Sequence, residues 1–361
     1  MKPCCKWISL TCCAALLGFA AAQAQLPSSV MTLRSITRAM TLNYRLLTPA
    51  GYDHTKKYPL ILAFHGVSQD GTDESNTGYV DYNSLCLYWV SNTLQAAHPC
   101  FVVAPHNPSG TWIDTNYTTC NTTGTYHQGP ISTRLSTVMG ILDSLQREFS
   151  IDTNRLYVTG LSVGGFATWD LITRYPCKFA AAIPMSGAGD TSKAAAVALV
   201  PIWCCHGQID TVVTPIGERC MMAAIDRLDG SKGVAYPECN GTMCVTSFKT
   251  KLDSLVNAGI IHFYWERQNI GHAIWDVCYA NTSLQAWLFK QVKGATMVSG
   301  IYKERPAVAH RGNARIVLAH RSAIRSLLKR GGRVYDLRGS LMRKAGLEGS
   351  ASGRSLLMVS P

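Results

Sequence analysis

The sequence is poor in charge and contains none of the common short metal-binding patterns. Only 16% of its 361 residues are Asp, Glu, Lys or Arg, whereas 47% are hydrophobic. This composition excludes a largely disordered chain and supplies enough apolar side chains for a large core. No two cysteines have the Cys-x-x-Cys spacing, and no His-Glu-x-x-His stretch occurs. We therefore expect no metal site and no cofactor.

The sequence also lacks an apolar run of the roughly 20 residues that span a bilayer. A shorter run from Trp7 to Ala22 follows Lys2 and Lys6, and it ends at the small-x-small triplet Ala22-Gln23-Ala24. This order is typical of a secretory signal peptide, with a membrane anchor as the alternative. We expect residues 1–24 to be removed and the mature protein to be secreted or held at the cell surface, without stable membrane insertion.

The net charge of +12 is concentrated at the C-terminus. Residues 293–361 hold 14 Lys/Arg against 3 Asp/Glu, while residues 25–292 hold 18 bases against 19 acids. This contrast predicts a catalytic domain over 25–292 and a basic segment of a different kind over 293–361. A basic tail can bind nucleic acid, but in an exported protein we expect a solvated or processed segment and no nucleic-acid partner.

Ten of the 14 cysteines follow the expected signal peptide. In an oxidising compartment some of them should pair. Cys239 and Cys244 enclose a short Asn-Gly-Thr-Met loop, and they are the first pair that we expect to be bridged. Cys204 and Cys205 lie in an apolar strand, where adjacent side chains point to opposite faces. We expect both in the core, with one of them a candidate for a bridge.

Short apolar runs alternate with amphipathic segments from residue 40 onward. Strands are expected at 40–47, 58–64, 101–104, 155–159, 180–185, 199–205 and 260–265, and helices at 133–149, 163–175, 216–228, 246–258 and 282–292. Strands without polar residues that alternate with helices indicate an α/β domain, with a mostly parallel sheet covered on both faces. Such sheets bind ligands at the carboxyl ends of their strands. The long polar stretch 106–130 interrupts this rhythm, and we expect it to wall the active site and Trp112 to contact substrate.

The strongest motif is Gly160-Leu161-Ser162-Val163-Gly164. It follows an expected strand and opens an expected helix, which is the setting of a nucleophile elbow. The glycines are needed because a Cβ atom there would collide with neighbouring strands. We predict that Ser162 is a nucleophile, and the alternative is a helix-capping serine in a glycine-rich turn.

A serine hydroxyl is a weak nucleophile, so it needs a base that an acid holds in place. In this type of fold the order along the chain is Ser, acid, His. His272, in the loop after the last expected strand, is the predicted base, while His262 lies inside that strand and His206 before the acid. Asp210, in the loop after an earlier strand, is the predicted acid, with Asp276 as its rival.

The reaction also needs donors for the negative charge of a tetrahedral intermediate. One should be the backbone N–H of Val163. The other should come from the loop after Phe64-His65-Gly66, most simply the N–H of Val67. We interpret His65 as a residue that orders this loop.

Several segments together resemble the polyhydroxybutyrate depolymerase/feruloyl esterase-like branch of the α/β-hydrolases. They are Leu60-Ile61-Leu62-Ala63-Phe64-His65-Gly66, Gly160-Leu161-Ser162-Val163-Gly164, Pro184-Met185-Ser186-Gly187, His206-Gly207-Gln208-Ile209-Asp210, and Gly271-His272 with Trp275-Asp276. The resemblance covers residues 40–292, and prolyl-oligopeptidase-type catalytic domains share much of it. It implies an α/β-hydrolase fold with the triad Ser162, Asp210 and His272. Trp275 is a further expected substrate contact, and Cys177 departs from the pattern, because Asp is common after Tyr-Pro.

These observations favour a secreted serine carboxylesterase that acts on polymer-linked or carbohydrate-linked esters, such as feruloyl or acetyl esters or polyhydroxyalkanoate. The alternative is a serine peptidase of the prolyl-oligopeptidase type. Such peptidases gate access with a large N-terminal domain, whereas only residues 25–39 separate the expected cleavage site from the first expected strand. A complete triad argues against a third possibility, a binding protein without activity.

The basic segment has its own resemblance. Val334-Tyr335-Asp336 and the final run 355–359 are similar to the C-terminal sorting segments of bacteria that secrete through the type IX route. This implies a short appendage of β type and an interaction with a secretion machinery.

Overall fold

The structure is a computed structural model of the chain. It describes residues 26–67, 77–81, 84–108, 110–114, 124, 126–228, 234–237 and 246–294, together with three short C-terminal strands. The expected signal peptide, the expected Cys239–Cys244 bridge, much of the loop 106–130 and most of the basic segment lie outside the described residues. The chain divides into two compact units, Met1–Gln291 and Val292–Pro361, which are described separately.

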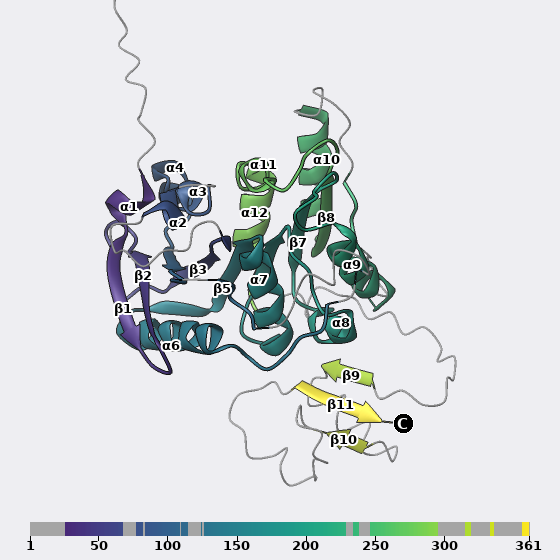
Figure 1. Cartoon of the computed structure of the whole chain (residues 1–361), viewed down its shortest axis with the longest axis horizontal. Helices are drawn as coiled ribbons and strands as arrows, with labels where there is room; N and C mark the ends of the chain where they lie inside the picture. The colour runs from purple at the N-terminus through teal and green to yellow at the C-terminus, as the bar shows by residue number, and fades with distance from the viewer. Residues whose placement is uncertain are drawn as a thin grey trace, which may run out of the picture. The chain divides into compact units, whose positions relative to one another are not determined.

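The described part of the first unit contains a mixed eight-stranded sheet with the order β1-β2-β4-β3-β5-β6-β7-β8 (Figure 1). Its strands are β1 (Thr32–Thr37), β2 (Thr41–Leu47), β3 (Tyr58–Phe64), β4 (Phe101–Pro105), β5 (Ile151–Leu161), β6 (Ala181–Met185), β7 (Ile202–Gly207) and β8 (His262–Arg267). The pairs β1–β2 and β2–β4 are antiparallel, and every pair from β4 to β8 is parallel. The prediction of a mostly parallel α/β sheet is therefore confirmed.

Helices cover both faces of this sheet (Figure 1). One face carries α6 (Thr133–Glu148), α7 (Val163–Arg174), α8 (Ala194–Val197) and α9 (Ile216–Leu228), and the other carries α1 (Pro27–Val30), α2 (Gly78–Asp81), α3 (Leu87–Val90), α4 (Asn92–Ala97), α10 (Thr246–Asn257), α11 (Trp275–Tyr279) and α12 (Thr282–Lys290). Alternate residues of β3 enter the two cores, because side chains of a strand point to opposite faces: Leu60 and Leu62 join one core, and Ile61 and Ala63 the other. Burial on both faces explains the nearly continuous apolar run of this strand.

The carboxyl ends of the parallel strands bring the predicted site together. Because β3, β5, β7 and β8 run parallel, their ends lie on one edge of the sheet. The loops that follow them carry Gly66 and Val67, Ser162, Asp210, and His272, respectively. Four segments that are distant in sequence therefore meet at one edge, as expected for ligand sites of open α/β sheets.

The described strands of the second unit are β9 (Arg315–Leu318), β10 (Arg333–Tyr335) and β11 (Leu356–Ser360), which pair antiparallel in the order β10-β11-β9. Val334 and Tyr335 of the expected sorting motif lie in β10. Within the part of the chain that the structure describes, no helix has the length and apolar character needed to cross a membrane.

Candidate active site

Ser162 occupies a sharp turn between β5 and α7. Its φ of 57° lies in the left-handed region, which a residue with a side chain rarely adopts. The turn is held by a hydrogen bond from the Ser162 N–H to the Met185 carbonyl oxygen at 2.9 Å. A Cβ atom on Gly160 would collide with the backbone of Gly164, and one on Gly164 would collide with the Phe64 carbonyl oxygen. The glycines of the motif therefore allow the close approach of β3, β5 and α7 that this turn requires.

His272 connects Ser162 to Asp210. The His272 Nε2 atom lies 2.9 Å from the Ser162 hydroxyl oxygen, and its Nδ1 atom lies 2.7 Å from Oδ2 of Asp210. Because a carboxylate accepts hydrogen bonds, Nδ1 carries the proton and Nε2 is left to accept the proton of the serine hydroxyl. This is the arrangement that general-base activation of a serine needs.

Asp210 is buried, with 3% of its surface exposed, and both carboxylate oxygens are engaged. Oδ1 accepts the backbone N–H groups of Val212 and Val213 at 2.8 and 2.9 Å, and Oδ2 faces His272. Burial opposes ionisation, but the hydrogen bonds from His206 and His272 outweigh it and hold the pKa of Asp210 well below its usual range. The rival acid, Asp276, is exposed in the first turn of α11, so the geometry favours Asp210.

The loop after β3 lies against the nucleophile. A Cβ atom on Gly66 would come within 3.5 Å of the Ser162 Cβ atom. His65 accepts the Asn107 N–H at Nε2 (2.9 Å), so its Nδ1 carries a proton and donates to the Gly66 carbonyl oxygen at 2.7 Å. Since the C=O and N–H of a trans peptide point in opposite directions, this bond also sets the direction of the Val67 N–H. His65 thus has the contacts of a loop-ordering residue, and the N–H groups of Val67 and Val163 remain the predicted oxyanion donors.

The two tryptophans predicted to contact substrate differ in position. Trp275 is 6% exposed, and its ring lies edge-on to His272 with the ring centroids 5.3 Å apart. Trp112 has no exposed surface, packs edge-on against Phe64, and donates its indole N–H to the His65 carbonyl oxygen at 3.0 Å. Trp112 therefore packs beneath the loop after β3, and this buried position does not support the expected contact with substrate.

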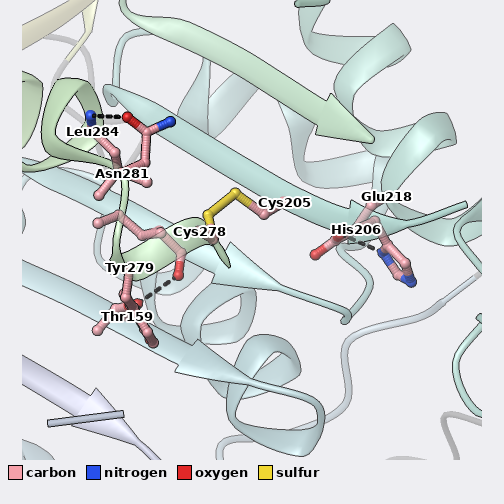
Figure 2. The surroundings of a disulfide bond; sticks show 9 residues. Thr159, Cys205, His206, Glu218, Cys278, Tyr279, Asn281 and Leu284 are labelled. Carbon is pink, nitrogen blue, oxygen red and sulfur yellow. Dashed lines mark hydrogen bonds and ion pairs between the residues drawn. A yellow bond between two sulfur atoms is a disulfide. The ribbon is translucent and has the colours of Figure 1, made fainter. Parts of the chain in front are cut away.

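Cys205 and His206, two other side chains near the site, have partners that the sequence analysis did not identify. Cys205 forms a disulfide with Cys278, across a sequence separation of 73, while Cys204 is a free buried thiol on the opposite face of β7 (Figure 2). The expectation that the adjacent cysteines face apart is therefore confirmed. The bridge joins the strand before the acid loop to the helix after His272. His206 pairs with Glu218 of α9, so it is not available as the base.

Among the residues that the structure describes, no three His, Cys, Asp or Glu side chains are grouped as metal ligands would be. The described residues of the site supply a hydroxyl, an imidazole and a carboxylate, which are groups suited to acid–base and nucleophilic chemistry.

Known proteins that resemble this chain in sequence or in fold include several hydrolases. No family model matches the chain. The chain is 32% identical to the bifunctional acetylxylan esterase/xylanase XynS20E of Neocallimastix patriciarum, over 43% of this chain and 20% of the relative. It is 30% identical to poly(3-hydroxyalkanoate) depolymerase C of Paucimonas lemoignei, over 36% of this chain and 28% of the relative.

Among solved structures, a thermostable esterase superposes with a TM-score of 0.59 at 27% identity, over 73% of this chain and 64% of that chain. The matched segments thus span less than a third of the two curated relatives and just under two thirds of the solved esterase. The sheet order, the turn at Ser162 and these similarities agree on the same group of proteins. The chain therefore has the α/β-hydrolase fold, and within that fold it is similar to an acetylxylan esterase, a poly(3-hydroxyalkanoate) depolymerase and a thermostable esterase.

Proposed function

We propose that this protein is a secreted serine carboxylesterase that cleaves polymer-linked or carbohydrate-linked carboxylic esters through an acyl-enzyme. The observation that supports this most is the pair of contacts of His272, which lies 2.9 Å from the Ser162 hydroxyl and 2.7 Å from Asp210. One relative is named an acetylxylan esterase and another a poly(3-hydroxyalkanoate) depolymerase, and both names support an ester substrate that belongs to a polymer.

In the proposed reaction, the Ser162 hydroxyl oxygen attacks the ester carbonyl carbon while Nε2 of His272 takes the hydroxyl proton. The carbonyl oxygen becomes negatively charged, and the N–H groups of Val163 and Val67 donate to it. His272 then gives its proton to the alcohol oxygen as the bond from this oxygen to the carbonyl carbon breaks. The alcohol departs, and the acyl group remains on Ser162 as an ester. In the second half, His272 takes a proton from a water molecule, and the water oxygen attacks the acyl carbon. The bond from the acyl carbon to Ser162 then breaks, Ser162 recovers its proton from His272, and the carboxylic acid departs. Asp210 stabilises the imidazolium formed in both halves.

The test is a Ser162→Ala variant assayed on a substrate panel. We expect the variant to fold and to lose activity by up to about 10⁶ in kcat. Asp210→Asn should lose far more activity than Asp276→Asn, because only Asp210 contacts His272. The panel is p-nitrophenyl acetate, butyrate and palmitate, methyl ferulate, acetylated xylan and a proline-containing peptide amide. Retained ester hydrolysis in folded Ser162→Ala would refute the proposal, and cleavage of the peptide amide alone would replace it with a peptidase.

Export and sorting complete the proposal. The segment 1–24 supports secretion, and residues 293–361, which supply none of the catalytic side chains, support a role in export or surface anchoring. Deletion of residues 300–361 should leave turnover of a small ester within a few-fold of the full chain and should change the location of the protein in its host. Loss of small-ester turnover, or unfolding of the remaining chain, would show that the segment belongs to the catalytic domain.

A further inference from the structure

Behind Asp210 lies a second, fully buried charged pair that the proposed reaction does not use. His206 and Glu218 both have 0% of their surface exposed. Nδ1 of His206 lies 2.6 Å from Oε2 of Glu218 (Figure 2). Nε2 of the same ring lies 2.8 Å from the Val213 carbonyl oxygen and 3.2 Å from Oδ2 of Asp210. The ring therefore joins two carboxylates, one of which holds the predicted catalytic base.

The partners of His206 determine its protonation. The Val213 carbonyl oxygen can only accept hydrogen bonds, and ionised carboxylates can likewise only accept them. Between such partners both ring nitrogens donate, and the ring is a cation. Both oxygens of Glu218 are engaged, because its Oε1 atom accepts the N–H groups of Trp169 and Gly187, each at 3.1 Å, while Oε2 faces His206. Burial alone would lower the pKa of His206, but the charge of Glu218 and the bonds to both carboxylates raise it to about 10.

The charges of His206 and Glu218 cancel, so Asp210 keeps the negative charge that stabilises His272. A lone imidazolium beside Asp210 would compete with His272 for its negative charge. With Glu218 present, the group of Asp210, His206 and Glu218 carries a net charge of −1, the same as Asp210 alone. The position of Asp210 is nevertheless fixed, because its Oδ2 atom accepts a hydrogen bond from His272 and also makes an ion-pair contact with Nε2 of His206 at 3.2 Å. The pair thus adds a restraint without removing the charge that stabilises His272.

Glu218 also ties this restraint to the nucleophile. Trp169 lies in α7, the helix that begins directly after Ser162, and Gly187 follows Ser186, whose hydroxyl donates to the His272 carbonyl oxygen at 3.1 Å. One carboxylate from α9 therefore contacts the nucleophile helix, the end of β6 and the residue that holds the acid.

We propose that His206 and Glu218 are positioning residues that fix the Asp210 carboxylate, and through it the orientation and tautomer of His272. The proposal rests on the proposed function in that Ser162, Asp210 and His272 act as a triad. It predicts a loss in kcat rather than a rise in KM, because neither side chain is exposed to substrate.

Four other titratable groups face the pair. His272 lies across Asp210, and Cys204 and Tyr264 are buried thiol and phenol groups whose pKa values are raised chiefly by burial. Glu266 is the penultimate residue of β8 and pairs with Arg219. Burial opposes ionisation of Glu266, but the hydrogen bonds from Arg219 and Tyr264 lower its pKa. Glu266→Gln is therefore a matched control, since it removes a neighbouring charge and leaves every contact of the His206 ring.

The first test uses the unaltered full chain. In ¹⁵N-histidine NMR at pH 8, both ring nitrogens of His206 should be protonated, with the signals assigned by their loss in His206→Gln. A neutral His206 ring at this pH would overturn the proposal whatever the kinetics of the variants, and it would leave the proposed ester hydrolysis untouched.

The second test is kinetic, with rates normalised to Ser162 titrated by a fluorophosphonate. His206→Gln leaves two buried carboxylates without a cation between them. Its kcat should fall about tenfold or more, within the range of coupling between contacting residues, and the acid limb of its pH profile should move to higher pH. His206→Gln/Glu218→Gln removes the second carboxylate and should regain part of the loss, while Glu266→Gln should stay within a few-fold of the unaltered enzyme. An unchanged pH profile in His206→Gln, or no recovery in the double variant, would refute the positioning role. Failure of Ser162 to react with the fluorophosphonate in the unaltered enzyme would instead count against the proposed function.

Discussion

The Cys205–Cys278 bridge should contribute strongly to stability, and its effect can be isolated. The bridge closes a loop with a sequence separation of 73. A cross-link of this span reduces the entropy of the unfolded chain by an amount worth about 4 kcal/mol in the chain-entropy model. Both sulfur atoms are fully buried. Replacement of both cysteines by alanine therefore removes packing as well as the cross-link, and a control for the packing is needed.

Cys86 and Cys100 supply that control, because they are buried and not bridged. Cys86→Ala/Cys100→Ala loses the same atoms without losing a cross-link. With a urea m-value of about 3 kcal/mol/M, the cross-link should account for a fall of about 1.3 M in the urea midpoint of Cys205→Ala/Cys278→Ala beyond the fall of the control. Equal midpoints for the two double variants would refute the entropic argument, and thiol counting of each unfolded protein would verify that the bridge had formed.

Two more outcomes follow from the site. A Cβ atom on Gly207 would collide with the Gly271 carbonyl oxygen, whereas a Cβ atom on Gly271 would meet nothing within 4 Å. Gly207→Ala should therefore separate the loops that carry Asp210 and His272 and lower kcat by about 10²-fold. The kcat of Gly271→Ala should stay within a few-fold of the unaltered enzyme. Equal rates in the two variants would contradict the close approach of these loops. The folded-state pKa of His206, about 10, exceeds its unfolded value of about 6.5. Protonation of His206 therefore stabilises the fold fully below pH ~6.5, and this stabilisation is lost as the pH rises through about 10. The urea midpoint should accordingly fall more steeply between pH 7 and about 10.5 in the unaltered protein than in His206→Gln, and parallel curves would show that His206 is not charged.

The parts of the fold that follow from local patterns were predictable. β3 and α9 begin and end at the residues that the sequence indicated, because a strand buried on both faces is apolar throughout and an amphipathic helix repeats its apolar positions. β1 was missed. All of its residues are exposed or half-buried, and its Thr, Arg and Ser side chains give no apolar run, as suits a strand at the edge of the described sheet, where it pairs with β2.

The candidate site divides in the same way. Ser162 has a local motif, and the order of acid and base along the chain narrows the search for Asp210 and His272. Glu218 has no such signal, because a single acid in an amphipathic helix reads as a solvent-facing residue. It is buried only because the fold brings His206, Trp169 and Gly187 to its carboxylate.

Cys278 and Trp112 show why spacing alone was insufficient. The partner of Cys205 lies in a helix after a different strand, and no local feature distinguishes it from the other cysteines. Trp112 lies in a polar loop, where an aromatic ring suggests a binding surface. Its ring turns inward instead, because the indole N–H finds an acceptor in the His65 carbonyl oxygen and the ring packs on Phe64.

The contacts that restrain the proposed triad have a further consequence. Asp210 is held from β7 by His206, from its own loop by two backbone N–H groups, and its strand is bridged by Cys205 to the helix that follows His272. The acid is thus restrained independently of the base that it orients. In contrast, the described contacts of the His272 ring are with Ser162, Asp210 and Trp275 only. A base that must exchange its partner between a serine hydroxyl and a leaving alcohol gains from this asymmetry, because a fixed acid restores the ring orientation after each proton transfer. Substitutions behind the acid should therefore alter the rate of turnover more than substrate binding.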